Sequence, residues 1–383
     1  MEKYILTETS YFGRGCRAEL PEIIKDKNFR KVLLVTDQSL IDAGVVSKVT
    51  TILDQAKIKF KVFSDVEPNP TINNVLAGVD VCKEFEADVI VAVGGGSPMD
   101  TAKGISIVMT NPDRADIVSL NGLSNTLNPG LPLICVPTTH GTASEVTINY
   151  VITDPDRKIK MVCVDPHDLP IVAVVDSELM ETMPKSLASS TGMDALTHAI
   201  EGYIAKGKTT MSQMMSMKAI ELIFENLAPA VNDKDAKAIE NMALAQYIAG
   251  MAFSNCGLGI VHSMAHQLGA VYNTPHGLAN TLLLPTVMRF NGEVCANDFR
   301  EILCHIGRPD AKDLNDQDVI NTFVWKIEEL SKSIGINQTI KDVGCREEDL
   351  DMLADKAMED PCRPGNPRET TKEDFIRLYR EAM

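Results

Sequence analysis

The sequence predicts an α/β N-terminal domain with a parallel sheet over residues 1–183, followed by an all-α C-terminal domain over residues 184–383. Short apolar runs alternate with helical segments as far as Pro184, which is typical of a parallel sheet covered by helices. Beyond Pro184 the β-branched runs disappear, and longer amphipathic stretches separated by Gly or Pro take their place. A chain of 383 residues is long enough for two domains with separate cores.

Each predicted strand is a nearly continuous apolar run of the length expected for a strand that is buried on both faces. In chain order these runs occupy residues 29–37, 59–65, 87–96, 131–139 and 170–176. In the second half the apolar residues recur with a helical period, which predicts helices over residues 211–229, 236–253 and 317–334.

An Asp and four of the seven histidines of the chain gather between residues 194 and 276. Asp194 and His198 are four residues apart, as are His262 and His266, so each pair should project from one face of a helix. His276 follows in a segment that the sequence predicts to be a loop. Carboxylate and imidazole without cysteine suit a divalent metal such as Fe(II) or Zn(II), with a position left open for a substrate oxygen. The alternative is a set of separate helix histidines that are satisfied by ordinary hydrogen bonds.

The strand predicted near residue 90 runs into a glycine-rich turn, GGGSPMD (94–100). Its glycines let the backbone approach a ligand, and we expect Ser97 to cap the following helix with Pro98 in the first turn. The amides and the positive end of the helix dipole would then bind a pyrophosphate, which predicts Rossmann-like nucleotide binding by the N-terminal domain. A second polar turn, TTHGT (138–142), would add donors. The alternative is a tight strand-to-helix turn, since the G-x-G-x-x-G fingerprint is absent.

Asp37 ends the first predicted strand, in the sequence VTD. Its carboxylate could accept both hydroxyl groups of an adenosine ribose, which would favour NAD and repel the 2′-phosphate of NADP. It could equally cap the helix that begins near Gln38. The local sequence leaves both roles open.

The composition argues against several classes of protein, namely nucleic-acid-binding, membrane-spanning, secreted and disulfide-rich proteins. A net charge of −16 argues against nucleic acid or an anionic membrane as a partner. Nine cysteines without C-x-x-C spacing indicate reduced thiols rather than a disulfide framework, and hence a cytoplasmic location. The start, MEKYILTETSYFG, has neither the basic nor the apolar segment of a secretory signal. No apolar run approaches the roughly 20 residues of a membrane span.

Motifs along essentially the whole chain resemble those of the iron-dependent (group III) alcohol dehydrogenases. They are YFGRG near the N-terminus, PNPT (68–71), GGGSPMDTAK (94–103), EVTINYVITD (145–154), VCVDPHD (162–168), TGMDALTHAIEGYI (191–204), GLGIVHSMAHQLGAVYNTPHG (257–277) and GNPRE (365–369). The resemblance implies a dehydroquinate synthase-like architecture, NAD(H) as cofactor, Fe(II) as metal with Zn(II) as the alternative, and a homodimer.

The resemblance also implies roles for the residues at matching positions. The metal ligands would be Asp194, His198, His262 and His276, with His266 beside the substrate as the catalytic proton relay, and with Asn149 and Phe253 lining the substrate pocket. The nucleotide would contact Asp37, Asn69, Gly95, Gly96, Ser97, Asp100, Thr138, Thr139 and Thr142, with Lys160 and Leu179 nearer the nicotinamide ribose. His140 stands where the family usually has a small residue, and would place an ionisable group beside the cofactor.

The activity that the resemblance implies is the reversible reduction of a small aldehyde, with lactaldehyde and 1,2-propanediol as the favoured pair. The metal would polarise the aldehyde oxygen, the nicotinamide would deliver hydride, and His266 would supply the proton. Glu201, three residues after His198, could orient a ligand, but a helix-surface or domain-contact role is favoured. His167 and His305 have no partner at a suggestive spacing, and we expect both to be structural.

Three other functions remain open. The same family contains dehydrogenases for 1,3-propanediol, butanol and ethanol. Dehydroquinate synthases resemble this fold and use NAD with zinc for a lyase-type cyclisation, but their pocket should offer basic side chains, and GIVHSMAHQLGAVYNTPHG offers none. The third is a non-catalytic protein with a structural metal, although such zinc sites are usually closed and rich in cysteine.

Overall fold

The computed structural model describes residues 2–157 and 159–383. The chain divides into two compact units, Met1–Met183 and Pro184–Met383, and the division falls at the boundary that the sequence predicts. The first unit is α/β with a parallel sheet and the second is helical, so the predicted fold class is confirmed.

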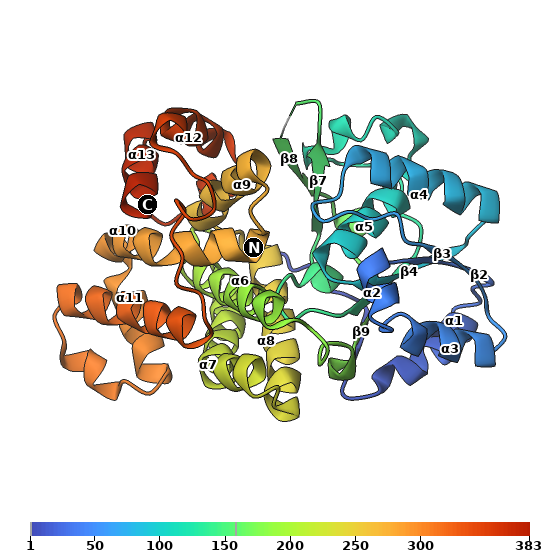
Figure 1. Cartoon of the computed structure of the whole chain (residues 1–383), viewed down its shortest axis with the longest axis horizontal. Coiled ribbons are helices and arrows are strands. Elements are labelled where there is room, and N and C mark those ends of the chain that lie inside the picture. Colours follow the sequence, from blue (N-terminus) through green and yellow to red (C-terminus); the bar gives the residue numbers. More distant parts are fainter. Residues whose placement is uncertain (1, 158) are drawn as a thin grey trace. The chain divides into compact units, whose positions relative to one another are not determined.

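The first unit is built on a six-stranded parallel sheet (Figure 1). From edge to edge its strands are β1 (Thr9–Phe12), β9 (Val172–Val175), β6 (Leu133–Pro137), β4 (Val89–Gly94), β2 (Lys31–Val35) and β3 (Lys59–Phe63). All five predicted strands are present, each shorter than the apolar run that predicted it. The sixth, β1, consists of the four residues TSYF and has no apolar run that could have revealed it.

Alternate residues of the central strands point into two separate cores. In β2, Leu33 and Val35 belong to a core that includes residues of α4 (Ile72–Phe85) and α5 (Gly96–Thr110). Val32 and Leu34 belong instead to a core with residues of α1 (Leu20–Asp26) and α3 (Ser47–Gln55). Helices therefore cover both faces of the sheet (Figure 1), which is why its strands are apolar throughout. A short helix, α2 (Gln38–Asp42), follows β2.

A second, three-stranded sheet runs in the order β5 (Gly122–Leu123), β8 (Ile159–Val164) and β7 (Asn149–Asp154). β7 and β8 are antiparallel, and none of the three strands was predicted. β7 buries only every second residue, Tyr150, Ile152 and Asp154. It is a one-sided strand, whereas the prediction relied on continuous apolar runs.

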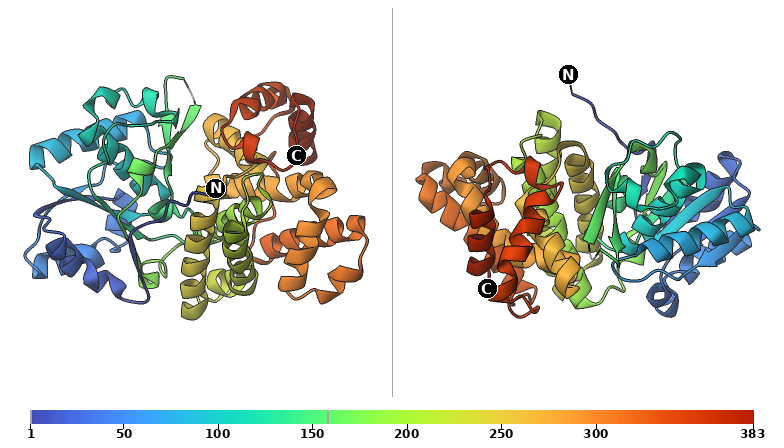
Figure 2. Two further views of the ribbon diagram at one scale, coloured as in Figure 1. Left: turned by 180° about the vertical axis from the view of Figure 1, so that it is seen from behind. Right: turned by 90° about the horizontal axis from the view of Figure 1, so that it is seen from above.

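In its described residues the second unit contains eight α-helices: α6 (Lys185–Ile204), α7 (Thr210–Asn232), α8 (Ala236–Cys256), α9 (Ile260–Tyr272), α10 (His276–His305), α11 (Asp316–Ser333), α12 (Leu350–Glu359) and α13 (Lys372–Glu381). The three predicted helices are confirmed as α7, α8 and α11. Figure 2 shows α6, α7 and α8 packed side by side. Helix α6 packs against α7, α8 and α10 and is buried from Ala188 to Ile204. For this reason its apolar residues are not confined to one face.

Among the described residues, no single helix has the length and apolar composition of a membrane span. In the part of the chain that the structure describes, one helix pair, α8 and α9, passes that test when taken together, and the two helices are bent by 103° relative to each other.

Candidate metal centre and nucleotide-binding loops

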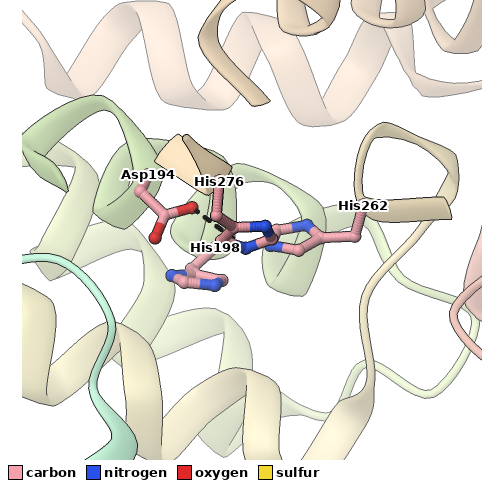
Figure 3. A group of neighbouring side chains, drawn as sticks. All are labelled: Asp194, His198, His262 and His276. Atoms are coloured by element: carbon pink, nitrogen blue, oxygen red, sulfur yellow. Dashed lines mark ion pairs between the residues drawn. The ribbon is translucent and has the colours of Figure 1, made fainter. Parts of the chain in front are cut away.

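Four side chains of the helical unit converge at one point (Figure 3). Asp194 and His198 project from α6, His262 from α9, and His276 from the first position of α10. One potential ligand atom from each lies within 4.8 Å of the others. Both pairs with four-residue spacing lie on helices as predicted. The predicted loop position of His276 is wrong, since this residue begins a helix directly after Pro275.

The start of α10 comes unusually close to α6, and a glycine makes this possible. A Cβ atom on Gly277 would lie 2.3 Å from the carbonyl oxygen of Ser190. One turn further along α10, the side chain of Asn280 donates a hydrogen bond of 2.7 Å to Asp194 Oδ1. Its Nδ2 also lies 3.2 Å from Nε2 of His262 and from Nε2 of His276. Asn280 is not among the residues predicted from the sequence, although its spacing of four residues from His276 places it on the same helix face.

Burial shapes the electrostatics of these four side chains. Desolvation raises the pKa of Asp194 and lowers that of His262 well below its ordinary value, because both charged forms are disfavoured away from water. Nδ1 of His198 is buried and has no hydrogen-bond partner among the described residues. A divalent cation would supply a positive charge beside these four side chains and would accept lone pairs from their oxygen and nitrogen atoms. One carboxylate and three imidazoles therefore fit Fe(II) or Zn(II).

The role predicted for Glu201 from the sequence is wrong. We predicted a helix-surface or domain-contact role, but its side chain is 1% exposed and lies inside the unit. Its Oε2 is 2.5 Å from Nδ1 of His262, and its Oε1 accepts a 2.8 Å hydrogen bond from the amide of Val261 in the first turn of α9. Burial raises the pKa of Glu201 to about 7. The carboxylate thus orients a histidine of the candidate metal site and satisfies the start of its helix.

His266 lies next to the four ligand candidates without belonging to them. Its ring is stacked on that of His276, with centroids 5.4 Å apart, and its Nδ1 is 2.8 Å from Asp360 Oδ2. Phe253, predicted to line the substrate pocket, stacks on the ring of His198 at 4.3 Å. Asn149, the other predicted pocket residue, belongs to the first unit and begins β7.

The two predicted nucleotide-binding turns pack against each other. The amide of Thr138 donates to the carbonyl oxygen of Gly94, and a Cβ on Gly95 would lie 3.0 Å from the methyl group of Thr139. A Cβ on Gly96 would likewise lie 3.3 Å from the methyl group of Thr142.

The predicted cap at Ser97 is wrong. α5 begins at Gly96, and its N-cap, Gly95, provides no side-chain hydrogen bond. Because the tight turn places Ser97 inside the first turn of the helix, no serine hydroxyl occupies the end of the helix. The backbone amides there remain available to an anionic ligand.

Three other residues predicted to contact the nucleotide form hydrogen bonds within the first unit. Lys160 Nζ donates to Asn69 Oδ1 at 2.7 Å. Asp100 accepts from the hydroxyl group of Ser144 and from the amide of Val151, and burial raises its pKa to about 6.

The structure also shows the surroundings of Asp37, Leu179 and His140, three further residues that were expected near the nucleotide. Asp37 Oδ1 accepts from the amide of Leu40, so the helix-cap role is present. The side chain of Leu179 is buried in the core that contains α1 and α3, which leaves only its backbone for contact with a nucleotide. His140 is fully buried, and burial lowers its pKa to about 4. The expected ionisable group at this position is therefore neutral at neutral pH.

Of the two histidines expected to be structural, His167 lies with its Nδ1 3.0 Å from the hydroxyl oxygen of Thr126. His305 ends α10, where its Nδ1 is 2.9 Å from the carbonyl oxygen of Glu301. Neither is in the metal-ligand cluster described above.

Known proteins match the chain over nearly its full length. An iron-containing alcohol dehydrogenase model matches residues 7–177, and the C-terminal model of the Fe-containing alcohol dehydrogenase family matches residues 188–383. Lactaldehyde reductase of Escherichia coli (strain K12) is 48% identical over 381 residues, which cover 99% of each chain.

Two solved structures are similar throughout. One is of 1,3-propanediol oxidoreductase, with a TM-score of 0.96, 39% identity and 100% coverage of both chains. The other is of sulfoacetaldehyde reductase from Bifidobacterium kashiwanohense in complex with NAD+, with a TM-score of 0.88 and 29% identity. It covers 100% of this chain and 98% of that one.

Proposed function

The chain belongs to the iron-containing alcohol dehydrogenase family, and from that membership we propose that it reduces lactaldehyde reversibly to 1,2-propanediol with NADH. The observation that carries the proposal is the convergence of one carboxylate and three imidazoles within 4.8 Å. A site without cysteine that keeps a position open is typical of catalytic rather than structural metals.

Asp194, His198, His262 and His276 would hold the metal, and Fe(II) is the ion that the family name favours over Zn(II). When bound, this Lewis acid polarises the substrate carbonyl and stabilises the developing alkoxide. The chain's own contribution is orientation, because Glu201 fixes the ring of His262 and the side-chain amide of Asn280 donates to Asp194 Oδ1.

The first unit would bind NAD(H) at the start of α5. Its uncapped amides and the packed glycine and threonine turns suit a pyrophosphate. The bound NAD+ in the sulfoacetaldehyde reductase supports this cofactor. Asp37 at the end of β2 would then accept hydrogen bonds from the adenosine ribose.

His266 would supply the proton that the alkoxide requires. Its ring stacks on that of a ligand histidine, and an imidazole has an intrinsic pKa suited to proton transfer near neutrality. Phe253 would form an apolar wall beside the metal, since its ring covers one face of His198.

The test is an anaerobic assay of NADH oxidation by Fe(II)-loaded protein with lactaldehyde, glycolaldehyde, propanal and butanal. We expect the highest kcat/KM for lactaldehyde, no turnover by metal-free protein, and recovery when Fe(II) is added back. A higher kcat/KM for butanal would favour a butanol dehydrogenase. In the oxidation direction, a preference for 1,3-propanediol over 1,2-propanediol would indicate a 1,3-propanediol oxidoreductase, which is the activity named for one of the similar solved structures.

A further inference from the structure

We propose that Asp360 is a positioning residue for proton transfer, acting through His266 by holding the Nδ1 proton of its imidazole. The inference rests on the proposed function. In the reduction, the Nε2–H bond of a doubly protonated His266 breaks and an O–H bond forms on the alkoxide. The imidazole that remains keeps its Nδ1–H on Asp360, so charge and protons balance.

The contacts of Asp360 show why its carboxylate is suited to this role. Its Oδ2 is 2.8 Å from Nδ1 of His266, and its Oδ1 accepts a 2.9 Å hydrogen bond from the amide of Cys362. Only 7% of Asp360 is exposed. Burial alone would raise the pKa of Asp360, but the charge and the hydrogen bond of His266 hold it below its ordinary value. The carboxylate is therefore ionised and accepts from both partners, and its Oδ2 also accepts a 3.4 Å hydrogen bond from Nε2 of Gln267.

Asp360 directly follows α12, which packs against α9. Two imidazoles one turn apart on α9 thus each place Nδ1 against a buried carboxylate from elsewhere in the unit, Glu201 for His262 and Asp360 for His266. Only His262 belongs to the four-ligand cluster. This difference divides the roles, because Glu201 acts on a metal ligand, whereas Asp360 acts on the proton donor.

The decisive variant is Asp360→Asn. An Asn offers one acceptor oxygen where the wild type uses two, so either the amide of Cys362 or Nδ1 of His266 loses its partner. We expect kcat for lactaldehyde to fall about tenfold to a hundredfold, with the KM for NADH and the bound metal unchanged. The matched control is Asp349→Asn, before the start of the same helix. There the carboxylate accepts from Tyr272 instead, and kcat should stay within about twofold of wild type.

A double-variant comparison separates positioning from a structural role. In a His266→Ala background, Asp360→Asn should cause no further fall in kcat, because the group through which it acts is gone. A second fall of the same size, an unchanged kcat in the single variant, or loss of metal from it would overturn the proposal.

A spectroscopic readout keeps this inference separate from the proposed function. In Zn(II)-loaded protein, long-range ¹H–¹⁵N NMR should show neutral His266 as the Nδ1–H form, and Asp360→Asn should shift it toward the Nε2–H form. If no aldehyde is reduced, the proposed function fails while the spectrum still decides the role of Asp360. If aldehydes are reduced but wild-type His266 is the Nε2–H form, the role of Asp360 fails alone.

Discussion

His262 and His266 lie one turn apart on α9, yet their partners differ. His262 faces the metal-ligand cluster and Glu201, whereas His266 faces Asp360. Spacing predicted that both would share a helix face, but it could not assign their partners, because both carboxylates come from distant parts of the chain.

His262→Ala should therefore remove the metal and the activity together, while the fold survives on the packing of its helices. His266→Ala should keep most of the metal and lower turnover by about 10²- to 10⁴-fold, the range for loss of a general acid. Elemental analysis and NADH oxidation measure both effects, with His305→Ala as the control. Equal metal loss in the first two variants would contradict the assignment.

We expect Asp37 to decide between NAD(H) and NADP(H). A 2′-phosphate a few ångströms from its carboxylate costs about 1–4 kcal/mol at an intermediate effective dielectric, which is roughly 5- to 1,000-fold in selectivity. Asp37→Gly should raise kcat/KM for NADPH and lower it for NADH. An unchanged ratio would show that Asp37 serves only as the cap of α2 that the structure shows.

Two single residues show where the sequence alone was insufficient to predict the role of a side chain. The sequence favours a helix-surface or domain-contact role for Glu201, because nothing in its own helix indicates that every face of α6 is buried. Ser97 was expected to be a cap because serine favours that position, but the tight turn places Gly95 there instead.

At the scale of elements, the geometry of the candidate metal centre depends on how closely α10 approaches α6. A Cβ on Gly277 would meet backbone atoms of Ser190 at 2.3 Å and 2.8 Å, and backbone cannot move aside as a flexible side chain can. Gly277→Ala should push His276 away from Asp194. We expect a loss of about 1–3 kcal/mol, seen as metal affinity lowered by about tenfold or more.

The control for this change is Gly104→Ala in α5. There the three atoms nearest to the new Cβ all belong to the side chain of Val75, with its two methyl groups at 3.0 Å. This variant should lower the melting temperature without weakening the metal. Unaltered metal binding in Gly277→Ala, measured by competition with a chelator, would show that α10 has room to adjust.

A strand or helix could be predicted from the sequence where its own residues carry a clear apolar pattern. The inner strands are buried on both faces and are apolar throughout, so their sequence identified them. The hairpin of β7 and β8 and the short β1 depend on neighbours that no local run of residues reveals.

For the whole molecule, stability should depend on pH through a buried pair in the first unit. Asp168 and Lys103 lie 3.5 Å apart with both side chains fully buried, and burial raises the pKa of Asp168 to about 8. The folded state thus holds this proton more tightly than the unfolded chain does. Its contribution to stability is complete below the ordinary Asp value of 3.8 and declines as pH rises toward about 8.

Asp168→Asn cannot lose that proton. Its melting temperature should therefore rise relative to that of wild type between pH 5 and pH 8.5, as measured by calorimetry at both values. The exposed Asp26→Asn serves as the control. A difference between Asp168→Asn and wild type that stays constant with pH would contradict the shifted pKa.

The ligand candidates sit on three helices that are far apart in sequence, and this has a consequence for the lifetime of the protein. A metal bound to α6, α9 and α10 closes one long loop (199–261) and one short loop (263–275), as a covalent cross-link would. Loop closure costs entropy that grows only with the logarithm of loop length, so a single ion can restrain much of the helical unit. The metal-free chain should open more often and be degraded sooner. Metal supply in a cell would then set how long each molecule persists, as well as how fast it works.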